Sequence, residues 1–192
     1  MKLKIKDMAT VQMGYSFRSR LEYSKAGTIS VIQMKNLLAD NTVSHEELLK
    51  IEMQALKKHH FVKRGDLVFR SRGLITTSSI VLGNLDQAVV AAPLIRIRLT
   101  EPEKFLPEYL NWFINQNEAQ AFLTSRAKGT TQKMISKQAL EGLEVYLPFL
   151  EKQKKIVKMA TLSFRETHLL KTIAQKRSQY IGLTLMQSAK GE

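Results

Sequence analysis

The last forty or so residues restrict the fold of this chain more than any other segment. From Leu150 to Ala189 helix-forming residues dominate, with no proline and one interior glycine, Gly182. At about 1.5 Å per residue, about 37 helical residues make a rod of roughly 55 Å. Steps of three and four residues along this rod give an apolar seam of Met159, Leu162, Leu169, Ile173, Tyr180 and Leu183. An isolated rod would leave the seam in water, and the sequence contains no second long helix to cover it. The pattern therefore predicts a partner helix from another chain.

The segment before this helix indicates how a globular part ends. Gly129 to Val157 reads GTTQKMISKQALEGLEVYLPFLEKQKKIV. This order predicts a basic polar loop, a helical turn capped by Ser136, a buried strand and a proline stop at Pro148. We therefore expect a globular domain over residues 1–148 and a long helix over residues 149–192.

Alternating and β-branched residues predict the strands of the globular part. They lie at 28–34, 67–69, 78–83 and 88–99, after an opening strand or short helix within 1–13. Together with the helices described next, these strands predict an α+β fold.

Two helices are expected between the strands. Ser44 and Glu47 form a capping-box pattern, which predicts a helix over about residues 45–58. Pro107 suits the first turn of another helix, which is expected to reach about Ser125. Its predicted buried face consists of Leu110, Ile114, Asn117 and Ala121.

Charge is the strongest clue to a binding partner. The 192 residues include 30 Lys and Arg against 17 Asp and Glu, a formal net charge of +13. Such basic proteins usually bind a polyanion, most often nucleic acid, and the alternative is a solvated basic surface that serves solubility. No apolar run approaches the roughly 18 residues of a membrane span, and the first residues lack the apolar region of a signal peptide. The absence of cysteine suits a cytoplasmic protein.

Three polar loops are candidate nucleic-acid contacts, because each combines cations with small polar side chains that can approach phosphates or base edges. The candidates are Lys128, Thr130, Thr131, Gln132 and Lys133 in the first loop, Arg70, Arg72, Thr76 and Thr77 in the second, and Tyr15, Ser16, Arg18 and Arg20 in the third. The first loop has an alternative interpretation as an ordinary polar connection, and the second as an edge strand protected by charge. In the third loop Phe17 is instead interpreted as a core residue.

The sequence predicts neither a metal site nor an active site. His59 and His60 are adjacent, with no Cys or carboxylate cluster at ligand spacing, so we interpret them as solvated residues at the end of the 45–58 helix. There is no GxxxxGK(S/T) loop, no GxG pair, no Glu followed two positions later by Lys, and no GxSxG serine. An Asp/Asn-Pro-Pro-aromatic tetrapeptide is also absent. We therefore expect a non-catalytic protein, with a nuclease of unrecognised site as an open alternative.

Three motifs in a fixed order resemble the DNA specificity (S) subunit of type I restriction–modification systems. They are KIKDMATVQMGYSFRS, VKRGDLVFRSRG and the stretch from Gly129 to Val157. Within the last, residues 148–156 (PFLEKQKKI) match the family's Pro-x-Leu-x-x-Gln-x-x-Ile start of a long helix. The resemblance covers essentially the whole chain. It implies a target recognition domain that reads DNA over residues 1–148, followed by a spacer and dimerisation helix.

Two departures from the family pattern qualify the resemblance. The family usually alternates two recognition domains with two long helices, whereas this chain has one of each, and Tyr146 stands where a second proline is usual. The first departure implies a half-size subunit that pairs with itself or with another half through an antiparallel coiled coil. Two paired copies would read a bipartite, inverted-repeat target.

The resemblance also implies partners that carry the chemistry. These are a DNA adenine methyltransferase (M) subunit and a restriction (R) subunit, with S-adenosylmethionine, ATP and magnesium held by the partners and no cofactor in this chain. A different class of function is a stand-alone dimeric DNA-binding regulator or a coiled-coil interaction module.

Overall fold

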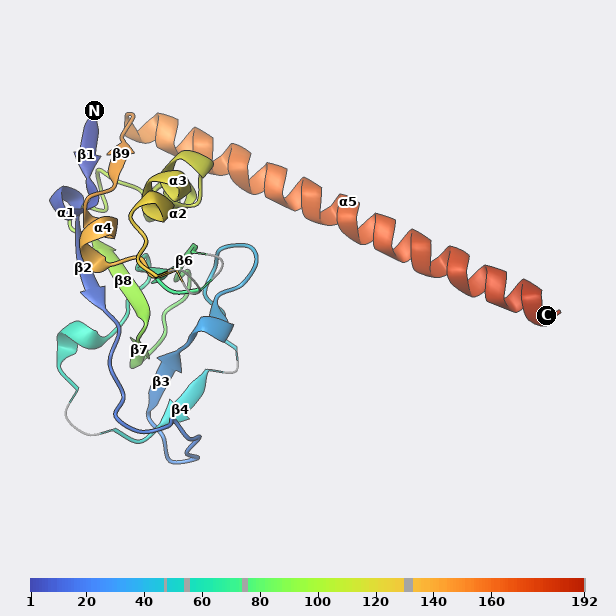
Figure 1. Ribbon diagram of the computed structural model, residues 1–192, viewed down its shortest axis with the longest axis horizontal. Helices are drawn as coiled ribbons and strands as arrows, with labels where there is room; N and C mark the ends of the chain where they lie inside the picture. Colours follow the sequence, from blue (N-terminus) through green and yellow to red (C-terminus); the bar gives the residue numbers. More distant parts are fainter. Residues whose placement is uncertain (47, 54–55, 74–75, 130–132, 192) are drawn as a thin grey trace. The chain divides into compact units, whose positions relative to one another are not determined.

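The computed structural model describes residues 1–46, 48–53, 56–73, 76–129 and 133–191. They form two units, a compact unit over Met1–Lys154 and a second unit over Lys155–Glu192. The compact unit contains the sheets and the short helices, and the described part of the second unit is almost entirely helical (Figure 1).

The elements follow the order of the chain. The N-terminal half of the compact unit contains β1 (Lys2–Lys4), α1 (Ile5–Met8), β2 (Ala9–Met13), β3 (Ile29–Ile32), the 3₁₀ helix η1 (Met34–Asn36), β4 (Leu49–Ile51), the 3₁₀ helix η2 (Lys58–His60), β5 (Leu67–Arg70), β6 (Ser78–Ile80) and β7 (Ala88–Val90). The remainder of the chain contains β8 (Leu94–Leu99), α2 (Pro107–Ile114), α3 (Asn117–Ser125), α4 (Lys137–Glu141), β9 (Glu144–Tyr146) and α5 (Leu150–Lys190).

The largest sheet has the order β2-β8-β5-β6, and every neighbouring pair is antiparallel. Residues alternate along its central strand β8, where Ile95 and Ile97 are fully buried and Arg96 and Arg98 face the other side. Ile97 pairs with Val11 of β2 and with Leu67 of β5. One apolar residue from each of three neighbouring strands therefore lies side by side across the sheet. The strand predicted at 67–69 is confirmed as β5, and the one at 78–83 is confirmed in shortened form as β6. The single strand predicted over 88–99 is instead two strands, β7 and β8, which belong to different sheets.

A second sheet, β4-β3-β7, contradicts the helix predicted over 45–58. In it Leu49 pairs with Val31, and Ile51 with Ile29. The capping pattern misled because the Ser44 hydroxyl accepts a hydrogen bond from the Glu46 amide two residues on, which is a local turn. Glu47, the other half of the predicted capping box, lies outside the described residues.

The helix predicted from Pro107 to Ser125 is two helices, α2 and α3, which meet at Asn115. The Asn115 amide accepts from the Ser78 N–H (2.9 Å) and donates to the Ser78 carbonyl (2.8 Å). It therefore occupies hydrogen-bonding positions on β6 that a further strand would take. The break also changes the buried face: Leu110 and Ile114 are buried as predicted, but Asn117 and Ala121 are exposed, and α3 buries Ala119 and Leu123 instead.

A small sheet joins the two ends of the compact unit. β1 pairs with β9, and the Leu147 N–H donates to the Met1 carbonyl (2.8 Å; Figure 1). Before β9, the Ser136 hydroxyl accepts from the Ala139 N–H and caps α4, as the sequence predicts.

The second unit consists of the greater part of α5, a helix of 41 residues. The side chains of the predicted seam are between 50% and 70% exposed within the single chain. Within the described ranges, no helix is both long enough and apolar enough to span a bilayer.

Candidate nucleic-acid interface

The first candidate loop is fastened to the second by backbone hydrogen bonds. Lys128 and Met134 exchange two such bonds (3.0 and 2.9 Å), which close the base of the loop. The Ile135 N–H then donates to the Ser71 carbonyl (2.8 Å), and the Gly73 N–H donates to the Lys133 carbonyl (3.2 Å). The two loops that the sequence proposed separately therefore form one surface.

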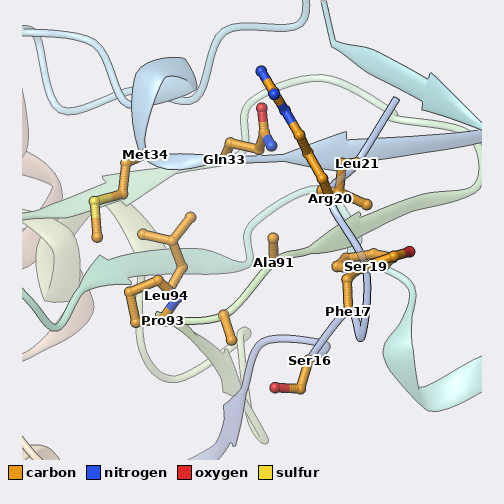
Figure 2. Close-up of a pocket in the computed structure, with 11 residues that line it drawn as sticks. Ser16, Phe17, Ser19, Arg20, Leu21, Gln33, Met34, Ala91, Pro93 and Leu94 are labelled. Atoms are coloured by element: carbon orange, nitrogen blue, oxygen red, sulfur yellow. The ribbon is translucent and has the colours of Figure 1, made fainter. Parts of the chain in front are cut away.

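The third candidate loop lies over a cavity of about 440 Å³. Ser16, Phe17, Ser19, Arg20 and Leu21 line it from the loop, and Gln33, Met34 and residues 91–94 line it from the sheet (Figure 2). The lining of the cavity thus has an apolar part, made by Met34, Pro93 and Leu94. Its polar part consists of Ser16, Ser19, Arg20 and Gln33.

The end of β5 connects this cavity to the first two loops. The Arg70 guanidinium donates to the Met34 carbonyl (3.0 Å), and the Ser71 hydroxyl donates to the Pro93 carbonyl. Met34 and Pro93 both line the cavity, while Ser71 also holds Ile135 through its backbone. All three candidate loops are consequently held on the same framework.

The predicted contact residues divide by exposure. Ser16, Arg18, Arg20, Arg72, Lys128 and Lys133 are exposed, which leaves their polar groups available to a ligand. Thr130, Thr131 and Gln132 lie outside the described residues.

The other four predicted residues are engaged in the fold. Thr76 is buried and its hydroxyl donates to the Gln120 side chain (2.8 Å), whereas Thr77 is half-buried and its carbonyl accepts from the Arg70 N–H. Arg70 is half-buried and directed at Met34. The Tyr15 ring packs 4.9 Å from Phe17 and 5.4 Å from His60, measured between ring centroids.

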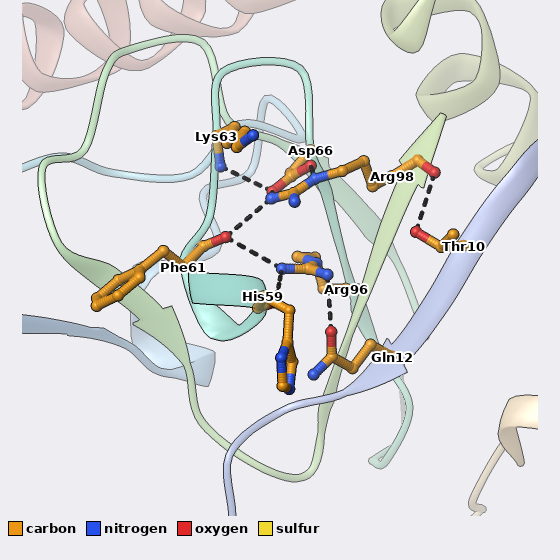
Figure 3. Close-up of polar contacts among 8 residues, drawn as sticks. All are labelled: Thr10, Gln12, His59, Phe61, Lys63, Asp66, Arg96 and Arg98. Atoms are coloured by element: carbon orange, nitrogen blue, oxygen red, sulfur yellow. Dashed lines mark hydrogen bonds and ion pairs between the residues drawn. The ribbon is translucent and has the colours of Figure 1, made fainter. Parts of the chain in front are cut away.

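Two arginines on β8, buried Arg96 and half-buried Arg98, support the basic segment before β5. Arg96 donates to the carbonyls of His59 (2.7 Å) and Phe61 (3.1 Å), and Arg98 forms a two-bond pair with Asp66 (both 2.6 Å; Figure 3). Asp66 also accepts from the Lys63 N–H (2.7 Å). Burial lowers the pKa of Arg96, and the neighbouring Arg98 adds to this effect. Both guanidinium groups are therefore engaged in holding this segment in place.

The histidines differ from the sequence interpretation, since the helix that they were expected to end is absent. His59 and His60 belong to η2, and His60 is half-buried. Desolvation lowers the pKa of His60, and the nearby charges of His59, Arg96 and Lys57 lower it further. Its Nδ1 lies 3.3 Å from the Gln12 side-chain nitrogen, and an acceptor role for Nδ1 requires an unprotonated ring nitrogen.

The structure also reveals surface residues that the sequence did not single out. Gln33 follows β3 and lines the cavity beside the third loop, and Lys57, Lys58, Lys63 and Arg64 are exposed around η2. A sequence signal existed for Gln33, because a polar residue that directly ends an apolar strand is placed at the edge of a sheet. Among the described residues no group of three or more His, Asp or Glu side chains is arranged to hold a metal ion.

Comparison with known proteins decides the family. Residues 1–176 match the family model described as the type I restriction modification DNA specificity domain. The chain belongs to this family. A search of curated proteins finds no match to this chain.

Solved structures share the fold of this specificity domain. A chain from a study of complex assembly and conformational transition of the type I R-M system has a TM-score of 0.70 at 17% identity, over 92% of this chain and 41% of its own. The HsdS subunit from Thermoanaerobacter tengcongensis has a TM-score of 0.64 at 17% identity, over 90% of this chain and 39% of its own. The type I restriction-modification system S subunit from M. genitalium has a TM-score of 0.58 at 13% identity, over 93% of this chain and 42% of its own. The predicted α+β fold with a long helix is confirmed, and the chain spans about two fifths of the length of these relatives.

Proposed function

We propose that this chain is the DNA-reading specificity subunit of a type I restriction–modification system. The observation that carries the proposal is the joined surface of the three loops, in a domain whose family is defined by DNA specificity. Exposed Arg18, Arg20, Arg72, Lys128 and Lys133 supply positive charge to phosphates, and hydroxyl and amide groups beside them supply base contacts. Thr130, Thr131 and Gln132 belong to the same proposed contact set.

The chain pairs through α5 in this proposal. The exposed apolar seam needs a cover, and an antiparallel copy of the same helix supplies one with matched periodicity. A symmetric pair of chains carries two recognition domains related by a two-fold axis, so its target is a bipartite inverted repeat. If the chain pairs instead with a half-subunit of different sequence, the two recognition domains differ and the two halves of the target differ as well.

Catalysis belongs to partner subunits. A methyltransferase subunit would supply S-adenosylmethionine chemistry at adenine, and a restriction subunit would supply ATP- and magnesium-dependent cleavage. The part played by this chain is to hold DNA in register for them through its own loops.

The proposal is tested by purifying the chain from its host, examining whether a methyltransferase co-purifies, and mapping methylated adenines in the host genome. Methylation at one bipartite sequence that disappears when this chain is deleted is the expected result. Sequence-specific binding by the chain alone, with no methyltransferase retained and no change in methylation, would support the stand-alone regulator instead. Metal-dependent cleavage by the purified chain would support a nuclease.

A further inference from the structure

The seam of α5 includes two charged positions. Steps of three and four residues from Met159 to Leu183 pass through Glu166 and Lys176 as well as through the apolar residues. Both charged side chains are exposed, and the positions three and four residues to either side of each are uncharged. Among the residues that the structure describes, neither of the two forms an ion pair. A partner for these charges therefore has to come from another helix.

An antiparallel copy of the same helix supplies that partner. In a two-fold contact, residue i of one copy faces residue j of the other, and residue j faces residue i. When the axis lies at the level of Lys171, every seam position faces another seam position. The facing pairs are Leu169 with Ile173, Glu166 with Lys176, Leu162 with Tyr180, and Met159 with Leu183. Apolar residues then meet apolar residues, and the acid meets the base twice in each dimer.

Other alignments leave the two charges unmatched. A slip of one heptad in either direction places both Glu166 and Lys176 opposite apolar residues of the seam. A parallel pair of helices places Glu166 opposite Glu166 and Lys176 opposite Lys176. Because polar residues inside a helix seam select the alignment in which they are satisfied, these two residues select the antiparallel one.

The cations beside the seam also fit this alignment. α5 contains nine Lys and Arg against two Glu, so two copies have to avoid placing like charges together. At the positions that flank the seam, the facing pairs are Lys158 with Met186, Arg165 with Gln179, and Arg177 with Ser163. Leu170, which is 62% exposed and lies outside the seam, meets its own copy at the axis. The like-charge pair of Lys152 with Lys190 lies at the ends of the helices, where solvent screens it.

We propose that α5 pairs with a second copy of itself in this one antiparallel register, which Glu166 and Lys176 specify. The inference rests on the pairing through α5 in the proposed function. The first residues of the two α5 helices then lie about 63 Å apart along the axis. A slip of one heptad changes this separation by about 10 Å, roughly the length of three base pairs. The two charged residues thereby set the spacing between the two halves of the bipartite target.

The test is the dissociation constant of the full-length dimer, measured by sedimentation, for Glu166→Lys and for Lys176→Glu. Each variant puts like charges at both pairs and should raise the constant by about 10- to 100-fold. The two variants change the net charge in opposite directions, so a loss in both is not an effect of overall charge. The double variant Glu166→Lys with Lys176→Glu should restore the dimer, and a mixture of the two single variants should form a heterodimer. Lys171→Glu, at an exposed position outside the seam, is the matched control and should leave the constant unchanged.

Cross-linking tests the register directly, because the chain has no cysteine of its own. A mixture of Leu162→Cys and Tyr180→Cys should give a disulfide-linked dimer on oxidation, and neither variant alone should do so. Self-linking of either variant alone, or single charge variants that dimerise like wild type, would overturn the register and leave DNA reading by the compact unit standing. A wild-type protein that is monomeric alone would overturn self-pairing, and the partner of α5 would then be a different chain. Loss of sequence-specific methylation without loss of the dimer would overturn the proposed function and leave the register standing.

Discussion

At the scale of single residues, Gly14 and Asp66 show what the motif residues contribute. Gly14 is required because any side chain would collide with the backbone of Ala91. Asp66 is 2% exposed and is held by Arg98 and by the Lys63 N–H. Both residues fix the framework on which the loops stand. The exposed cations proposed to contact DNA, such as Arg20 and Lys128, lie outside these framework positions.

Asp66→Ala should strongly destabilise the compact unit, because it leaves the Arg98 guanidinium without its buried partner. The expected loss is about 3–5 kcal/mol of the free energy of unfolding, measured by urea denaturation. Glu141→Ala removes a partner from the half-exposed Lys137–Glu141 pair and should cost less than about 1 kcal/mol. Equal effects for the two variants would contradict the structural role of Asp66.

His60 should make stability depend on pH. Its pKa is lowered in the folded protein, so protonation favours the unfolded chain. Its contribution is therefore complete above its ordinary pKa of 6.5 and is lost as the pH falls from there through the lowered value. His60→Gln, which keeps an acceptor, should show a smaller drop in melting temperature between about pH 7.5 and about pH 5 than wild type. His45→Gln, at an exposed site, should behave like wild type.

At the scale of elements, Gln153 explains the glutamine of the PFLEKQKKI motif. It lies in the first turn of α5, within the compact unit, and is 1% exposed. Its side chain accepts from the Leu106 N–H (3.0 Å) and donates to the carbonyls of Pro148 (2.9 Å) and Lys104 (3.3 Å). One side chain thus ties the start of the helix to the segment that leads into α2.

Gln153→Ala should leave three part-buried backbone groups without the partners that Gln153 supplies, and should cost on the order of 3 kcal/mol in chemical denaturation. Gln175→Ala, at an exposed position of the same helix, is the matched control and should change little. A Gln153→Ala protein as stable as the control would show that water replaces the lost bonds.

The loop closed by Lys128 and Met134 should supply phosphate contacts. Lys128→Glu together with Lys133→Glu should weaken duplex binding severely and reduce the slope of log affinity against log salt by about two, one unit for each lost contact. Lys6→Glu together with Lys104→Glu makes the same change in net charge at other exposed lysines and should retain the slope. Equal losses for both pairs would mean that overall charge, and not this loop, governs binding.

The sequence predicted elements well where one periodicity dominates and poorly where tertiary contacts compete. The alternation of Ile95 and Ile97 and the cap at Ser136 were sufficient. The 45–58 segment failed because Leu49 and Ile51 pair with β3, a contact distant in the chain that outweighs a local capping pattern. The candidate loops could be proposed from their charge, but the burial of Thr76 depends on Gln120, a distant residue that only the fold brings to it.

At the scale of the whole molecule, the exposed seam predicts that the protein is not a monomer. Leu169→Lys together with Ile173→Lys should place charges on the seam and give monomers by light scattering, with the compact unit still folded by circular dichroism. Thr161→Lys together with Gln175→Lys adds the same charge away from the seam and should leave the oligomer intact. A dimer that survives the seam variant would show that another face of α5, such as that of Leu170, Ala174 and Ile181, makes the contact.

The amide of Asn115 has a consequence for the proposed dimer. An open sheet margin recruits foreign strands, and a protein that joins its copies by helices would then possess a second, unregulated route to aggregation. By occupying the Ser78 hydrogen-bonding groups, Asn115 blocks that route at β6. The proposed pairing through α5 would then not compete with strand addition at Ser78.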